Sequence, residues 1–165
     1  MITIKQGDIT EEEVDVIVNA ANATLQGGGG VDGAIHQAAG SSVMDECRRI
    51  GLCMTGKAVI TNAGKLKAKK IIHAVGPVWH GGDRDEAELL KSAYFNSFIL
   101  AKENALKTIA FPAISTGVYG YPICEAARIA LLTGKEFEKD FDEIRYVCFS
   151  KPDLEAYKST FDEIN

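Results

Sequence analysis

The chain has 165 residues, of which 46% are hydrophobic, and a formal net charge of −5. This length suits one domain that buries roughly 70% of its unfolded surface, so we expect a single domain over residues 1–165. The acidic balance argues against general nucleic-acid binding, although a local pocket can still bind an anion through oriented N–H groups.

The four cysteines and three histidines show no spacing typical of disulfides or of a metal site. No secretory leader is recognisable, so we expect reduced thiols in the cytoplasm. No apolar run approaches the length of about 18 residues that a membrane span needs. The sequence therefore predicts a cytoplasmic monomer with no metal, no cofactor and no membrane association.

Apolar patterns predict strands that alternate with helices along the chain. We expect strands at residues 2–5, 14–18, 58–61, 70–75, 108–111 and 144–149. Helices are predicted at residues 31–39, 41–50, 86–106, 122–137 and 152–161. A further short helix would begin with a capping box in which Thr10 is the N-cap. The alternation indicates an α/β sandwich, in which ligands collect at the carboxyl ends of the strands.

The apolar run of residues 16–18 breaks into the stretch Asn19–Gly40, which reads NAANATLQGGGGVDGAIHQAAG. A strand followed by a glycine run and a small-residue helix gathers backbone N–H groups at a helix N-terminus, which favours anion binding. Asn19 and Asn22 precede the glycines and Asp32 follows them, and a folded-back loop would bring Asn22 and Asp32 to one rim of a pocket. Taken alone, the stretch is equally consistent with a flexible spacer.

A second loop of this kind, residues 113–121, follows the strand that ends at Phe111 and leads into the helix near Pro122. Two such loops at neighbouring strand ends could bind a diphosphate from both sides. A single one would be an ordinary connection between a strand and a helix.

Three other motifs are rejected. Gly28–Gly33 matches GxGxxG, but Leu52 and Cys53 stand where a dinucleotide fold needs an acidic residue. The stretch 51–58 resembles a Walker A loop but lacks the Ser or Thr that would hold Mg²⁺. Ser115 lacks the GxSxG frame of a serine nucleophile.

The motifs that remain resemble a known family. The pattern Asn22-x6-Gly29-Gly30-Val31-Asp32-Gly33 is similar to the signature of the MacroD-type macrodomains, ADP-ribose-binding modules that include ADP-ribosyl hydrolases. Residues 7–10, 75–79 and 111–120 are similar to the other family blocks, in the same order. The resemblance implies a three-layer α/β/α sandwich with a central mixed, mostly parallel sheet. It also implies that the first strand is an antiparallel or edge partner.

The resemblance further implies roles for individual residues. Asp32 would orient or deprotonate a water, and Asn22 would hold the distal ribose hydroxyls. Asp8 would bind the adenine amino group, Tyr119 the distal ribose, and Phe149 would stack on adenine. The complete set expected to contact ADP-ribose, besides Asn22 and Asp32, is Asp8, Ile9, Ala20, Gly29, Gly30, Val31, Ser115, Thr116, Gly117, Val118, Tyr119 and Phe149.

The implied activity is that of a mono-ADP-ribosyl hydrolase, which removes ADP-ribose from acidic residues of proteins and deacetylates O-acetyl-ADP-ribose. Its partners would be ADP-ribose and ADP-ribosylated proteins. A reader that binds ADP-ribose without hydrolysing it is the alternative, and the pair Asn22 and Asp32 favours the hydrolase. By residue type alone, Asp8 could also be a turn residue and Phe149 a core residue. His36 is interpreted as a packing residue, and the sequence leaves open whether Asp32 or a substrate phosphate activates the water.

Overall fold

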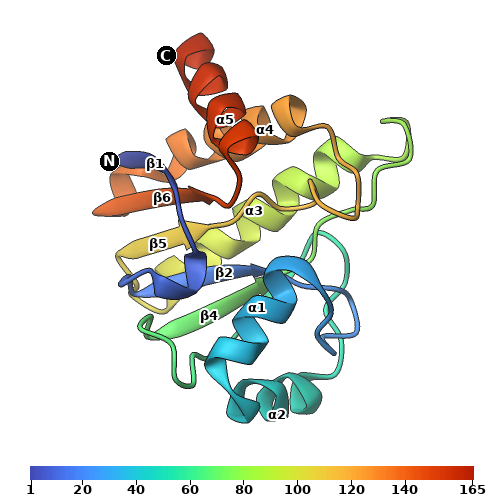
Figure 1. Ribbon diagram of the computed structural model, residues 1–165, viewed down its shortest axis with the longest axis vertical. Coiled ribbons are helices and arrows are strands. Elements are labelled where there is room, and N and C mark those ends of the chain that lie inside the picture. The colour runs from blue at the N-terminus through green and yellow to red at the C-terminus, as the bar shows by residue number, and fades with distance from the viewer.

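The computed structural model describes residues 1–165 and consists of a six-stranded sheet between two layers of helices (Figure 1). The strands are β1 (Ile2–Gln6), β2 (Val16–Ala20), β3 (Ala58–Asn62), β4 (Lys70–Ala74), β5 (Thr108–Phe111) and β6 (Glu143–Cys148). The helices are α1 (Gly30–Ala39), α2 (Ser41–Ile50), α3 (Glu86–Glu103), α4 (Ile123–Phe137) and α5 (Lys151–Ile164), with short 3₁₀ helices η1 (Ile9–Glu11) and η2 (Glu138–Asp140). None of the helices is both long and apolar enough to cross a bilayer.

The sheet has the order β1-β6-β5-β2-β4-β3, and its only antiparallel pair is β3 with β4. The predicted sandwich around a mixed, mostly parallel sheet is therefore confirmed. β1 lies at one edge, as one alternative had it, but it pairs with β6 in parallel, so the antiparallel alternative is wrong. The antiparallel strand is β3 at the opposite edge.

Several predicted boundaries are wrong: β2 covers Val16–Ala20 instead of residues 14–18, and α5 ends at Ile164 instead of Phe161. Two other helix boundaries are wrong for local reasons. The N-cap of η1 is Asp8, whose carboxylate accepts the Thr10 N–H at 2.9 Å, so Thr10 does not begin a capping box. α3 ends at Glu103 instead of Leu106, because Ala105 adopts a left-handed conformation with φ 56°.

The two faces of the sheet pack against different helices, because successive strand residues point to opposite sides. Val16 and Val18 of β2 pack in one core with α3, α4 and α5, whereas Ile17 packs in the other with α1 and α2. β2 and β5 are hydrogen-bonded neighbours in the middle of the sheet, running in the same direction. The loops that follow these two strands therefore leave the sheet side by side.

Candidate functional site

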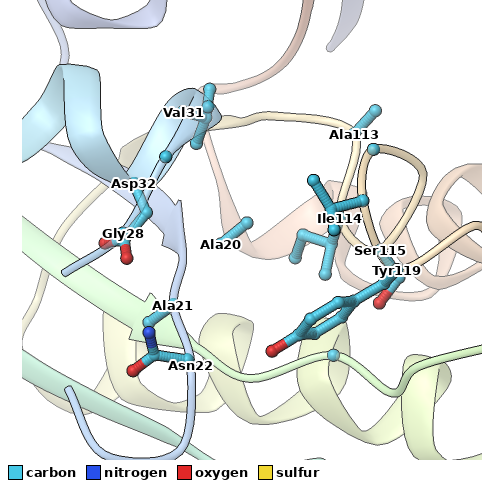
Figure 2. Close-up of a pocket in the computed structure, with 15 residues that line it drawn as sticks. Ala20, Ala21, Asn22, Gly28, Val31, Asp32, Ala113, Ile114, Ser115 and Tyr119 are labelled. Carbon is cyan, nitrogen blue, oxygen red and sulfur yellow. The ribbon is translucent and has the colours of Figure 1, made fainter. Parts of the chain in front are cut away.

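A cleft lies where β2 and β5 end, between the loops that follow them (Figure 2). One part has a volume of about 310 Å³ and contains Asn22, Asp32 and Tyr119. The adjoining part has a volume of about 360 Å³ and contains Asp8 and Phe149. The two parts form one continuous site, because four residues line both: Gly30, Val31, Ala113 and Gly117. Volumes of this size are typical of small-molecule sites.

Both loops carry backbone N–H groups that donate no hydrogen bond within the protein. On the first loop these are the N–H groups of residues 27–32, which include the first turn of α1. On the second loop they are the N–H groups of residues 115–119. No lysine or arginine lines either part of the cleft. An anion in this cleft would therefore be bound by N–H groups and by the positive end of the α1 dipole.

The second loop is held in shape by its own hydrogen bonds. The N–H of Tyr121 donates to the Ser115 carbonyl at 2.9 Å, and the N–H of Gly120 donates to the Gly117 carbonyl at 3.0 Å. The Thr116 hydroxyl donates to the Ala113 carbonyl at 3.2 Å. Ser115 itself has a φ of 69°, a left-handed conformation that is uncommon outside glycine. The loop is thus fixed through its carbonyl groups, and its N–H groups remain available.

Asp32 lies in the first turn of α1 and is 7% exposed. Its Oδ1 accepts a hydrogen bond from Asn19 Nδ2 at 2.8 Å and lies 3.3 Å from His36 Nε2. Its Oδ2 accepts no hydrogen bond from the protein and lies beside Gly28, which Figure 2 shows next to the carboxylate. The carboxylate is therefore held through one oxygen, and the other is free to accept a hydrogen bond.

Asn22 fastens the glycine loop. Its Nδ2 donates to the Gly27 carbonyl at 2.8 Å, and its Oδ1 accepts from the Thr24 hydroxyl at 3.0 Å. Figure 2 shows Asn22 and Asp32 on the same wall of the cleft, and the Tyr119 hydroxyl reaching towards Asn22 from the opposite wall. The glycine run is therefore a wall of the cleft, not a flexible spacer.

All fourteen residues predicted from the resemblance line the cleft. Asp8 caps η1 and also lines the second part of the cleft, so it is both a turn residue and a residue of the site. Phe149 is 80% exposed, which excludes the alternative of a core phenylalanine. The individual roles of these residues stay predictions.

Some residues of the site were not assigned from the sequence. Asn19 is completely buried and holds Asp32, and His36 contacts the same carboxylate instead of serving only as a packing residue. A buried asparagine needs a partner, so an asparagine inside the apolar run 16–20 was the available signal. Trp79 was also unassigned. Its backbone N–H donates to the Tyr119 carbonyl at 2.9 Å and its ring centroid lies 4.7 Å from that of Tyr121, so it braces the second loop.

His36, Cys47 and His73 also converge, with one nitrogen or sulfur atom from each lying within 4.8 Å of the others. Burial, followed by the nearby carboxylates of Asp32 and Glu46, raises the pKa of the Cys47 thiol to about 11, so it keeps its proton. The two imidazoles stack with centroids 5.8 Å apart, and both ring nitrogens of His73 lie within hydrogen-bond distance of other side chains, Nδ1 of Asn19 and Nε2 of Thr61. The cluster has the features of a hydrogen-bonded core better than those of a tetrahedral metal site.

Comparison with known protein sequences identifies relatives of one family. Residues 18–130 match the sequence model of the Macro domain. A Salmonella newport (strain SL254) protein named O-acetyl-ADP-ribose deacetylase is 54% identical over 163 residues, covering 94% of this chain and 91% of that protein. A macro domain-containing protein of Listeria monocytogenes is 56% identical over 165 residues, covering 94% of each chain.

Solved structures of macrodomains superpose closely on this chain. The Oceanobacillus iheyensis macrodomain with ADP superposes with a TM-score of 0.92 at 44% identity, covering 96% of this chain and 88% of that one. The Trypanosoma brucei macrodomain in complex with ADP-ribose superposes with a TM-score of 0.91 at 37% identity, covering 97% of this chain and 68% of that one.

Proposed function

Because this chain belongs to the macrodomain family, we propose that it binds ADP-ribose and hydrolyses carboxylic esters of the distal ribose. One observation carries the proposal: two runs of unpartnered N–H groups line a cleft that also holds a carboxylate with one free oxygen. The N–H groups suit a diphosphate, and the carboxylate suits the activation of water. The relative named O-acetyl-ADP-ribose deacetylase supports the same chemistry.

The two parts of the cleft suit the two ends of ADP-ribose. The adenine lies in the part with Asp8 and Phe149, where a carboxylate can accept from the amino group and an exposed aromatic ring can stack. The diphosphate lies between the two loops. The distal ribose then reaches the part that contains Asn22, Asp32 and Tyr119.

Hydrolysis requires a water at the free oxygen of Asp32. The water gives a proton to Oδ2 while its oxygen adds to the ester carbonyl carbon, and the bond from that carbon to the ribose oxygen then breaks. The released ribose oxygen takes the proton from Oδ2, which restores the carboxylate of Asp32. General-base assistance of this kind is worth about 10² to 10⁴ in rate. Acetyl esters and the esters formed by glutamate or aspartate share this bond, so both O-acetyl-ADP-ribose and proteins modified on acidic residues are proposed substrates.

The decisive experiment compares wild type with Asp32→Ala and Asp32→Asn. Release of ADP-ribose from a glutamate-linked mono-ADP-ribosylated protein, and of acetate from O-acetyl-ADP-ribose, is measured beside ADP-ribose binding by calorimetry. We expect both variants to bind ADP-ribose and to lose about 10²-fold or more in activity. Asp32→Asn is the stricter variant, because it retains the size of the side chain but not its basicity.

Two outcomes would contradict the proposal in different ways. A loss below about tenfold in both variants would remove Asp32 from the water-activating role and favour a substrate phosphate instead. Tight ADP-ribose binding with no release by wild type from either substrate would make the protein a reader.

A further inference from the structure

A row of buried polar side chains extends from Asp32 into the sheet, away from the cleft. Asn19 Nδ2, which donates to Asp32 Oδ1 at 2.8 Å, also lies 3.1 Å from His73 Nδ1. His73 Nε2 lies 2.9 Å from Thr61 Oγ1, and the Thr61 hydroxyl also lies 2.9 Å from the Asn62 carbonyl. Asn19, His73 and Thr61 are at most 1% exposed. They stand on β2, β4 and β3, three strands that are adjacent in the sheet.

The chemistry of these groups fixes the direction of every hydrogen bond. A carboxylate only accepts, so the amide nitrogen of Asn19, not its oxygen, must face Asp32. The second hydrogen of that nitrogen points to His73 Nδ1, which must therefore be an acceptor. The hydrogen of neutral His73 is then on Nε2 and is donated to Thr61, whose own hydrogen goes to the Asn62 carbonyl.

His73 is in the protonation state that this arrangement needs. Burial, followed by the neighbouring imidazole of His36, lowers the pKa of His73 to about 4, against the opposing effect of Asp32 and Glu46. His73 is therefore neutral at pH 7 and has one hydrogen to place. Thr61 supplies the acceptor that a hydrogen on Nε2 needs, because its own hydroxyl hydrogen is donated to the Asn62 carbonyl.

We propose that Thr61 is a remote positioning residue, which fixes the tautomer of His73, thereby the direction of the Asn19 amide, and thereby the carboxylate of Asp32. This inference rests on the proposed hydrolase function. Thr61 lines no part of the cleft, so it acts only through the row. Its effect is to hold Asp32 Oδ1 and leave Oδ2 for the water.

Loss of the Thr61 hydroxyl has a definite consequence. Without it, Nε2–H of His73 is buried with only the weak acceptor Cys47 Sγ at 3.8 Å, whereas the protonated thiol can instead donate to a bare Nε2. The hydrogen then moves to Nδ1, where it faces the amide hydrogens of Asn19. The amide must rotate to accept it, and this turns the Asn19 oxygen towards the carboxylate of Asp32, which is repelled.

The test is Thr61→Val, with Thr61→Ser as the matched control that retains the hydroxyl. Nitrogen-15 NMR of the imidazoles reports the tautomer directly, and the chain has only three histidines to assign. We expect Nε2–H at His73 in wild type and Thr61→Ser, and Nδ1–H in Thr61→Val. We also expect kcat in Thr61→Val to fall about tenfold or more, part of the general-base factor, while KM and ADP-ribose affinity change less than about threefold.

Several results would overturn the inference. A hydrogen on Nδ1 of His73 in the wild-type spectrum would overturn it directly, and this measurement does not depend on whether a variant folds. An unchanged tautomer or unchanged kcat in Thr61→Val would also do so, as would equal losses in Thr61→Val and Thr61→Ser. Failure of the proposed function is a separate result, because wild type itself would then release no product.

Discussion

Gly76 and Ser115 approach so closely that a Cβ atom at position 76 would lie 2.2 Å from Ser115 Oγ. Ser115 is 6% exposed, and its buried hydroxyl has no hydrogen-bond partner in the protein. Gly76 follows β4, whereas Ser115 lies in the loop after β5. The shape of the second loop therefore depends on a residue in the segment after another strand, and this residue must lack a side chain.

Replacing Gly76 tests this dependence. We expect Gly76→Ala to displace the loop, to weaken ADP-ribose binding about tenfold or more, and to destabilise the fold by roughly 1–3 kcal/mol through overpacking. Calorimetry and thermal unfolding measure the two effects. Gly7→Ala is the control for the stability measurement alone, because a Cβ there would meet no atom closer than 3.8 Å but Gly7 lines the second part of the cleft. Equal affinity in Gly76→Ala and wild type would show that the loop tolerates the displacement.

Phe149 should contribute to binding but not to stability, because its side chain is 80% exposed in the second part of the cleft. Stacking of one base on an aromatic ring is worth about 1–3 kcal/mol, so Phe149→Ala should weaken ADP-ribose binding about 5- to 150-fold. The melting temperature should stay within about 2 °C of wild type. Leu132→Ala, an exposed apolar residue of α4 outside the cleft, is the control. An unchanged affinity in Phe149→Ala would remove the predicted stacking role.

Glu86 organises the segment before α3 and is 1% exposed. Its carboxylate accepts the N–H groups of His80, Gly82 and Arg84 at 2.7, 3.0 and 2.6 Å. Desolvation opposes ionisation of Glu86, but these backbone hydrogen bonds outweigh it and lower its pKa from 4.5 to about 2. Because the folded state has the lower pKa, the stabilisation is complete above about pH 4.5 and is lost as the pH falls towards 2.

We therefore expect Glu86→Gln to melt at a lower temperature than wild type at pH 7, since the amide accepts through only one oxygen. The difference between the two melting temperatures should narrow as the pH falls from about 5 to 2, because wild-type Glu86 becomes protonated. Thermal unfolding of both proteins across this range measures it. A difference that stays constant over the whole range would contradict the assigned pKa.

The absence of lysine and arginine from the cleft lining predicts a weak dependence on salt. Between 50 and 200 mM NaCl we expect the Kd for ADP-ribose to rise less than about threefold, against roughly 10³-fold or more for proteins that neutralise many phosphates. Calorimetric titrations at constant pH and temperature measure this. A tenfold or larger change would show that charged side chains outside the cleft contribute to binding.

The sequence alone predicted those features that depend only on residues close to one another in the chain. Apolar patterns predicted the strands and helices, because side-chain periodicity follows from backbone geometry. The glycine run before Asp32 indicated an anion-binding loop, because free N–H groups at a helix N-terminus depend only on neighbouring residues. Asn22 and Asp32 followed from the resemblance, and the structure places them on one wall.

Only the tertiary structure decided features that depend on which strands are neighbours. The parallel pairing of β1 with β6 joins residues about 140 positions apart, which no local pattern specifies. Gly76 became important only because β4 and the loop after β5 converge, and Phe149 became a surface residue only because β6 ends before it. The row from Thr61 through His73 to Asn19 exists because β3, β4 and β2 are adjacent. Hydrogen bonds of this kind require proximity within about 3 Å, and long-range strand pairing alone provides it.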